Sequence, residues 1–180
     1  MRTDAASLRI EQFDPSRHTR SEFSCGVPRL DNFLRLTAKK QQKDDMTRVY
    51  VVVESGQAEI IGYHSINLGV MNVDRLERRP RNAPAHGELP VLFVGQVAVT
   101  QQAQGKGVGA ILMGHVFAKA ATIADQAGCF AVVLDVMSDG GADLFHKRKG
   151  WYRSFGFQDF PSDPARLFMT MRQVRDLLAA

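Results

Sequence analysis

The chain has 180 residues, of which 44% are hydrophobic, so one domain spanning residues 1–180 can bury a substantial core without disulfide bonds. Its two cysteines, Cys25 and Cys129, form neither a CxxC pair nor a Cys/His cluster at the spacing of zinc ligands, and no metal site is expected. The formal net charge of +4 attracts polyanions, but it does not distinguish a nucleotide cofactor from RNA.

The first residues carry no sign of export. Residues 1–10 include Asp4 and lack the apolar run of a signal peptide, and no later apolar run approaches the roughly 18 residues of a membrane span. We therefore expect a cytoplasmic protein that does not enter a membrane.

The first third of the chain predicts a short strand and then a helix. Apolar residues near positions 8–13 indicate the strand, and Asp14-Pro15-Ser16 indicates the turn after it. Pro28 suits the first turn of the helix. Its apolar stripe has helical spacing and consists of Leu30, Phe33, Leu34 and Ala38. The helix then ends in a cationic stretch, residues 39–43, which suits the helix dipole.

The middle of the chain predicts strands. Residues 48–54 and 58–73 form two β-rich runs separated by Ser55-Gly56-Gln57, which is typical of a hairpin. Residues 74–90 are rich in arginine and proline and predict a loop. An apolar strand is expected over residues 91–99.

The last third begins with a glycine-rich turn at residues 104–109. An amphipathic helix should follow to about Gln126, where Gly128 ends it, and then a buried strand over 130–136. A further helix is expected over 142–154, followed by a final strand region that starts at Gly156 and includes Met171. Early strands followed by a βαβ unit indicate an α/β or α+β protein with a mixed sheet.

The glycine-rich turn carries the clearest chemistry. Glycines let the backbone approach a ligand closely, and the free N–H groups at a helix N-terminus favour an anion such as a pyrophosphate. Glycines that serve only the conformation of the turn are the alternative. The turn lacks the lysine and hydroxyl pair of a Walker A loop, and it does not lie in the first βα unit as a dinucleotide fold requires.

Here the chain resembles the GNAT acetyltransferase superfamily, because Gln104, Gly107 and Gly109 match its acetyl-CoA loop. The resemblance implies an α/β (α+β) fold with a mixed, mostly antiparallel central sheet of about six or seven strands flanked by helices. It also implies that the strand before the loop binds the acetyl and pantetheine groups through its backbone. The residues assigned to acetyl-CoA, which is the co-substrate, are Val97, Ala98, Val99, Gln104, Gly105, Lys106, Gly107, Val108, Gly109 and Ala110.

A second motif, residues 151–157, is similar to the family's aromatic-Tyr-x-x-x-Gly-Phe ending. Tyr152 is then the candidate general acid that protonates the departing thiolate, although packing in a half-buried position is the commoner role of a tyrosine. The predicted strand 91–99 contains no Asp or Glu that would act as a general base. An α-amino group, with a pKa near ~7.7–8.0, needs no dedicated base, so this absence favours an α-amine acceptor. His115 and His146 remain possible bases, but lone histidines more often serve structure.

The N-terminal third narrows the resemblance to the GNAT toxins of type II toxin-antitoxin modules. The similar segments are residues 25–34, Lys40-Gln41-Gln42 and residues 48–53. The resemblance implies acetylation of the α-amino group of aminoacyl-tRNA, which blocks translation, with a ribbon-helix-helix antitoxin and a homodimer as possible partners. Cationic residues would contact phosphates of the tRNA, with solvated surface charge as the alternative. They are Lys39, Lys40, Lys43, Arg78, Arg79 and Arg81, with Arg75 in the same loop.

Two alternatives stay open. The first is an acetyltransferase of a small amine, an antibiotic or a protein amine, which shares both motifs but needs no basic surface. The second is a catalytically silent module of the same fold that senses acyl-CoA or binds a partner, because a fold does not fix a function.

Overall fold

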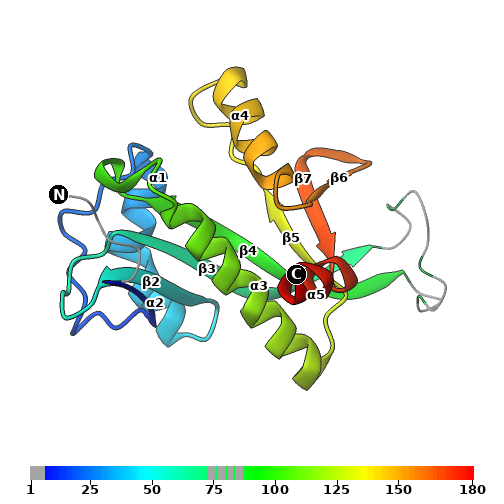
Figure 1. Cartoon of the computed structure of the whole chain (residues 1–180), viewed down its shortest axis with the longest axis horizontal. Helices are drawn as coiled ribbons and strands as arrows, with labels where there is room; N and C mark the ends of the chain where they lie inside the picture. The colour runs from blue at the N-terminus through cyan, green and yellow to red at the C-terminus, as the bar shows by residue number, and fades with distance from the viewer. Residues whose placement is uncertain (1–6, 73–75, 77–79, 81–82, 84–86) are drawn as a thin grey trace. The chain divides into compact units, whose positions relative to one another are not determined.

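The structure is a computed structural model, and it describes residues 7–72, 76, 80, 83 and 87–180. The chain divides into two compact units, one formed by residues 1–67 and 95–116 and the other by residues 68–94 and 117–180. Two strands and one helix run through both units: β3 (Gly62–Asn72), β4 (Glu88–Val99) and α3 (Val108–Ala127). Figure 1 gives the order of the elements along the chain.

The seven strands belong to one sheet in the order β1-β2-β3-β4-β5-β7-β6. The β4–β5 pair is parallel, whereas β1–β2, β2–β3, β5–β7 and β6–β7 are antiparallel. The parallel β4–β5 pair fits the βαβ unit that the sequence predicts, since parallel neighbours need a crossover connection and α3 lies between these two strands in the chain. The expected fold class, a mostly antiparallel mixed sheet of six or seven strands with helices, is confirmed.

The first unit contains β1 (Leu8–Gln12), β2 (Arg48–Glu54) and the first part of β3. The β2–β3 hairpin is confirmed, with Val52 opposite Gly62, but β3 begins at Gly62 rather than Ala58. Between β1 and β2, one helical stretch runs through α1 (Pro28–Asn32), a π-helical turn (Phe33–Thr37) and α2 (Ala38–Lys43). The predicted stripe is buried at Leu30, Leu34 and Ala38, while Phe33 is half-buried because the π turn shifts the register.

Two histidines of the first unit pack against each other, one buried and one half-buried. His64 on β3 is fully buried, and its Nε2 lies 2.8 Å from Nδ1 of His115 on α3. The ring of Tyr50 on β2 packs on both, with centroid distances of 5.2 Å and 4.7 Å. His115 therefore serves the packing of α3 against the hairpin, as the structural alternative in the sequence analysis had it.

The second unit contains β5 (Ala131–Asp135), α4 (Ala142–Arg153), β6 (Gln158–Phe160), β7 (Asp163–Thr170) and α5 (Met171–Ala179). Its core includes a cluster of buried side chains from β3, β4, β5 and β6: Met71, Leu89, Val91, Ala131, Val133 and Phe160. The predicted helix 142–154 matches α4 to within one residue, and Gly128 follows the end of α3 with a φ of 74°.

Two predictions at the ends of elements are wrong. Met171 does not end a strand but begins α5, because Thr170 forms a capping box with Gln173 and starts a new helix there. β4 begins at Glu88 rather than Val91, because Pro90 can still accept a hydrogen bond although it has no N–H to donate. Its carbonyl receives the N–H of Phe130 at 2.8 Å.

α3 meets the length and composition of a membrane span, contrary to the sequence expectation that no apolar run comes close. A core helix of a soluble protein passes the same test. α3 buries six residues with exposures of 0–2%: Val108, Leu112, Met113, Val116, Phe117 and Ala120.

Candidate functional site

The glycine-rich turn opens directly into the N-terminus of α3. Gly105 and Gly107 have φ angles of 75° and 84°, which side chains other than glycine rarely adopt. A Cβ atom added at either residue would meet nothing within 4 Å, so the outer side of the turn is open. The amides of Val108 and Gly109 belong to the first turn of the helix, where no intrahelical carbonyl is available to them. The turn thus presents N–H groups and the positive end of a helix dipole to an anion.

The side chain of Gln104 attaches this turn to two neighbouring segments of the chain. Its Nε2 donates to the carbonyl of Cys25 at 2.9 Å and to the carbonyl of Val99 at 3.0 Å. Both donors of the amide are therefore used by the fold, and the side chain ties the end of β4 to the segment before α1. Among the expected acetyl-CoA residues, Gln104 acts through the shape of the loop.

The last residues of β4 lead into the turn. Ala98 is buried, while Val97 and Val99 are half-buried and pack against a cluster that contains Val108. Gly62 on β3 permits this arrangement, since an added Cβ would lie 3.1 Å from the carbonyl oxygen of Ala98. The other expected residues differ in exposure: Lys106 and Ala110 are exposed, Gly109 is half-buried and Val108 is buried.

Tyr152 lies in the last turns of α4, in the second unit. Its ring meets those of Trp151 and Phe157 edge to face, with centroids 4.8 Å and 6.1 Å away. Burial raises the pKa of the Tyr152 hydroxyl to about 12, and the positive charge of Arg148 acts in the opposite direction. The phenol therefore stays protonated at neutral pH, as a proton donor must.

The observed start of β4 changes one premise of the sequence analysis. The strand contains an acid after all, Glu88, at its first position. Glu88 is exposed and precedes Val97 by nine residues along the chain, at the other end of the strand. The segment expected to contact the thioester still has no carboxylate of its own.

The expected tRNA-contacting residues are only partly described. Lys39, Lys40 and Lys43 are exposed on α2, where they form a cationic ridge. Arg75, Arg78, Arg79 and Arg81 lie outside the described residues. His146, the other histidine considered as a base, is exposed on α4 and packs edge to face on Phe145.

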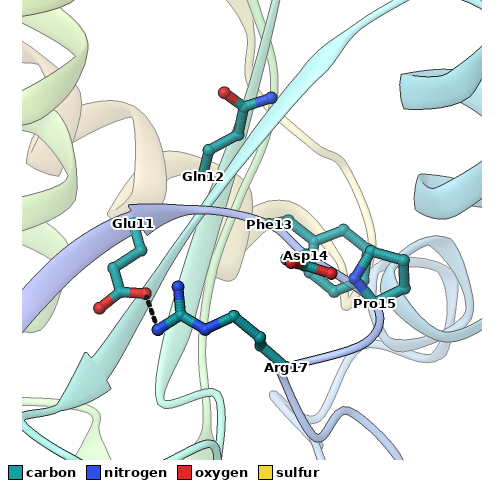
Figure 2. A pocket seen from close by; sticks show the side chains of 6 residues that line it. All are labelled: Glu11, Gln12, Phe13, Asp14, Pro15 and Arg17. Carbon is teal, nitrogen blue, oxygen red and sulfur yellow. Dashed lines mark ion pairs between the residues drawn. The ribbon is translucent and has the colours of Figure 1, made fainter.

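The structure also contains a pocket far along the chain from these residues. It lies at the end of β1 and is lined by Glu11, Gln12, Phe13, Asp14, Pro15 and Arg17. Figure 2 shows the guanidinium of Arg17 reaching across it to the carboxylate of Glu11, at 2.9 Å. The pocket includes none of the residues expected to bind acetyl-CoA. Arg17 and Glu11 pair with each other in it, and Asp14 accepts hydrogen bonds from Ser16. Nor do the described residues contain a group of three or more His, Cys, Asp or Glu arranged for a metal ion.

Comparison with known proteins agrees with this geometry. Residues 46–159 match the acetyltransferase (GNAT) domain family. The chain is 37% identical to the probable toxin TacT of Sinorhizobium fredii over 98% of both chains. It is 28% identical to a tRNA-acetylating toxin of Mycobacterium tuberculosis over 88% of this chain and 89% of the relative. A solved structure of AtaT complexed with an acetyl-methionyl-tRNA superposes with a TM-score of 0.83 at 20% identity, covering 95% of this chain and 99% of the other.

The chain belongs to the GNAT acetyltransferase family. The expectation of an acetyl-CoA-dependent N-acetyltransferase is therefore confirmed at the level of the family. A further solved structure, AtaTR bound with acetyl-CoA, has the same fold, with a TM-score of 0.80 at 20% identity over 96% of this chain and 99% of that one.

Proposed function

We propose that this protein transfers the acetyl group of acetyl-CoA to the α-amino group of an aminoacyl-tRNA and so acts as a toxin that blocks translation. The observation that carries the proposal is the end-to-end similarity to two proteins, one named a probable toxin and the other a tRNA-acetylating toxin. The open glycine turn at the N-terminus of α3 supports the acetyl-CoA part on physical grounds.

In this proposal the pyrophosphate of acetyl-CoA binds backbone N–H groups at the start of α3, such as those of Val108 and Gly109, and the backbone of Val97 to Val99 binds the acetyl and pantetheine groups. The substrate amine attacks the thioester carbonyl, whose oxygen is stabilised by backbone N–H groups. A C–N bond forms and the C–S bond breaks, the amine gives up a proton to water, and Tyr152 supplies the proton that the thiolate takes. A phenol is already protonated in the neutral range, and burial, which raises the pKa of Tyr152 to about 12, leaves it so.

The acceptor follows from the missing base. Residues 91–99 contain no Asp or Glu to act as a base. A lysine amine with a pKa near ~10.4 would then remain charged, whereas an α-amine near ~7.7–8.0 is substantially neutral at physiological pH. The cationic ridge of Lys39, Lys40 and Lys43 supplies phosphate contacts of the kind that RNA requires.

We further propose a soluble, cytoplasmic protein with one catalytic domain over residues 1–180, able to form a homodimer and neutralised by a ribbon-helix-helix antitoxin. Solved structures of AtaT bound to the C-terminus of the antitoxin AtaR support the antitoxin, because that fold matches this chain with a TM-score of 0.80 at 19% identity.

The test is release of free CoA from acetyl-CoA with charged tRNA as the acceptor, comparing the wild type with Tyr152→Phe. Loss of the general acid should slow transfer by about 10²- to 10⁴-fold without preventing acetyl-CoA binding. Uncharged tRNA, which offers no α-amine, is the control and should give no CoA above background. Turnover with small amines or protein amines but none with charged tRNA would refute the tRNA acceptor. An active Tyr152→Phe protein would refute the role of Tyr152.

A further inference from the structure

Lys149 on α4 is a buried lysine, with 8% of its surface exposed, three residues before Tyr152. Lysines are rarely buried, because removing an ammonium from water is unfavourable unless its donors are satisfied. Its neighbour Lys147 on the same helix is exposed. A buried lysine does not help to keep the helix soluble, as the exposed Lys147 does, so Lys149 must have another role.

The ammonium of Lys149 is held from three directions. Its Nζ donates to the carbonyl of Pro164 on β7 at 2.6 Å and lies 3.2 Å from Oδ1 of Asp159 on β6. It also lies 5.9 Å from the ring centroid of Phe145, one turn back on α4. Since two of these partners belong to the β6–β7 pair, the lysine fixes α4 to that pair at one height and one rotation.

The neighbouring cations strengthen the same attachment. Arg153 pairs with Asp159, and this contact, followed by that of Lys149, lowers the pKa of the Asp159 carboxyl. At the other side of the helix, Arg148 donates to the carbonyls of Met137 and Asp139, in the segment between β5 and α4. These cations therefore attach α4 both to β6 and β7 and to the segment before the helix.

A buried ion pair adds little to stability compared with an apolar side chain of similar size. Asp159 is about half-exposed and also pairs with Arg153, so it would not be left buried and unpaired if Lys149 were replaced. An apolar replacement loses the two contacts that fix the orientation of α4, namely the hydrogen bond to the Pro164 carbonyl and the ion pair with Asp159. Residues three apart on a helix are neighbours, so this constraint acts on the turn of α4 that carries Tyr152.

We propose that Lys149 is a positioning residue for acetyl transfer, which sets the location of the Tyr152 hydroxyl by fixing α4 to β6 and β7. This inference rests on the proposed role of Tyr152 as general acid. Lys149 itself touches neither acetyl-CoA nor the acceptor in this account, and its effect appears in the chemical step rather than in binding.

The main experiment compares Lys149→Met with the wild type and with the matched control Lys147→Met. Lys149→Met should lower kcat about 10- to 100-fold, as a displacement of about 1 Å can, while KM for acetyl-CoA changes by less than about twofold. The urea midpoint should stay within error of the wild type, and Lys149→Arg should recover part of kcat. Asp159→Asn, which alters a half-exposed side chain, should shift kcat in the same direction and guards against a misfolded Lys149 variant.

A double variant tests whether Lys149 acts through Tyr152. If it does, Lys149→Met causes little further loss when combined with Tyr152→Phe. An equal loss in both backgrounds, or an unchanged kcat in Lys149→Met, would overturn the inference.

A second readout does not depend on turnover. Trp151 is the only tryptophan in the chain and packs on Tyr152, so acrylamide quenching of its fluorescence reports on this turn of α4. Quenching should rise in Lys149→Met but not in Lys147→Met, and equal quenching in the two would refute the positioning role. If the wild type acetylates no amine, the proposed function fails, yet this measurement still decides whether Lys149 positions the turn.

Discussion

The side chain of Gln104 makes hydrogen bonds within the protein, although the family motif suggests that it contacts the ligand. Its amide donates to two carbonyls, those of Cys25 and Val99, and so determines how the turn leaves β4. In the proposed function, acetyl-CoA binding therefore depends on Gln104 through the backbone of the glycine-rich turn.

Replacing Gln104 by leucine should leave both carbonyls without these donors and loosen the turn. We expect the unfolding free energy to fall by about 1–2 kcal/mol and the Kd for acetyl-CoA to rise. Urea unfolding and isothermal titration calorimetry measure the two effects, with the exposed Gln102→Leu as a matched control. A tighter or unchanged Kd would show that the turn keeps its shape without the amide.

Tyr152 makes a second prediction, in alkaline solution. Burial raises its pKa in the folded protein to about 12, above the value near ~10 of an unfolded chain. The protonated phenol thus stabilises the fold fully below about pH 10, and this contribution is lost as the pH rises from about 10 to 12. Urea unfolding of the wild type should weaken more steeply over that window than that of Tyr152→Phe. Parallel curves would mean that the phenol is not withdrawn from water.

The helices and strands whose apolar residues recur at regular spacing are the ones that the sequence predicts well. The β2–β3 hairpin and the helices α3 and α4 follow from alternation, helical periodicity and a glycine after a helix, which are all local signals. The π turn at residues 33–37 and the early start of β4 depend on packing and on a proline carbonyl, which periodicity does not register. The glycine turn was predictable because glycine chemistry is local, whereas the burial of Lys149 depends on β6 and β7 and had no local signal.

α5 did have a signal that we overlooked. Thr170 and Gln173 are spaced as a capping box, and Met171 and Val174 of the helix that follows are buried. Thr170→Ala should remove the hydroxyl that receives the N–H of Gln173 and lower the unfolding free energy by about 1 kcal/mol. Thermal and urea unfolding check this value, with Thr122→Ala, on the exposed surface of α3, for comparison. An effect no larger than that of the control would mean that packing alone starts α5.

At the scale of the whole molecule, the net charge of +4 and the cationic ridge on α2 should determine how strongly the binding of the proposed tRNA substrate depends on salt. If Lys39, Lys40 and Lys43 each contact one phosphate, their joint replacement by glutamine should reduce the slope of log K against log salt by about 2–3. Filter binding of charged tRNA between about 50 and 200 mM salt measures the slope. An unchanged slope would place the phosphate contacts elsewhere, and acetyl-CoA affinity, which serves as the control, should not change.

The surroundings of Cys25 have a consequence for an enzyme that handles thioesters. Its backbone carbonyl receives Gln104, so its thiol belongs to the segment that the acetyl-CoA turn rests on. Burial, followed by the neighbouring Asp31, raises the pKa of the Cys25 thiol to about 11, and burial also raises the pKa of the Cys129 thiol. Only a thiolate attacks a thioester efficiently. Both thiols therefore form the thiolate less readily than an ordinary cysteine does, which lowers their reactivity toward a thioester.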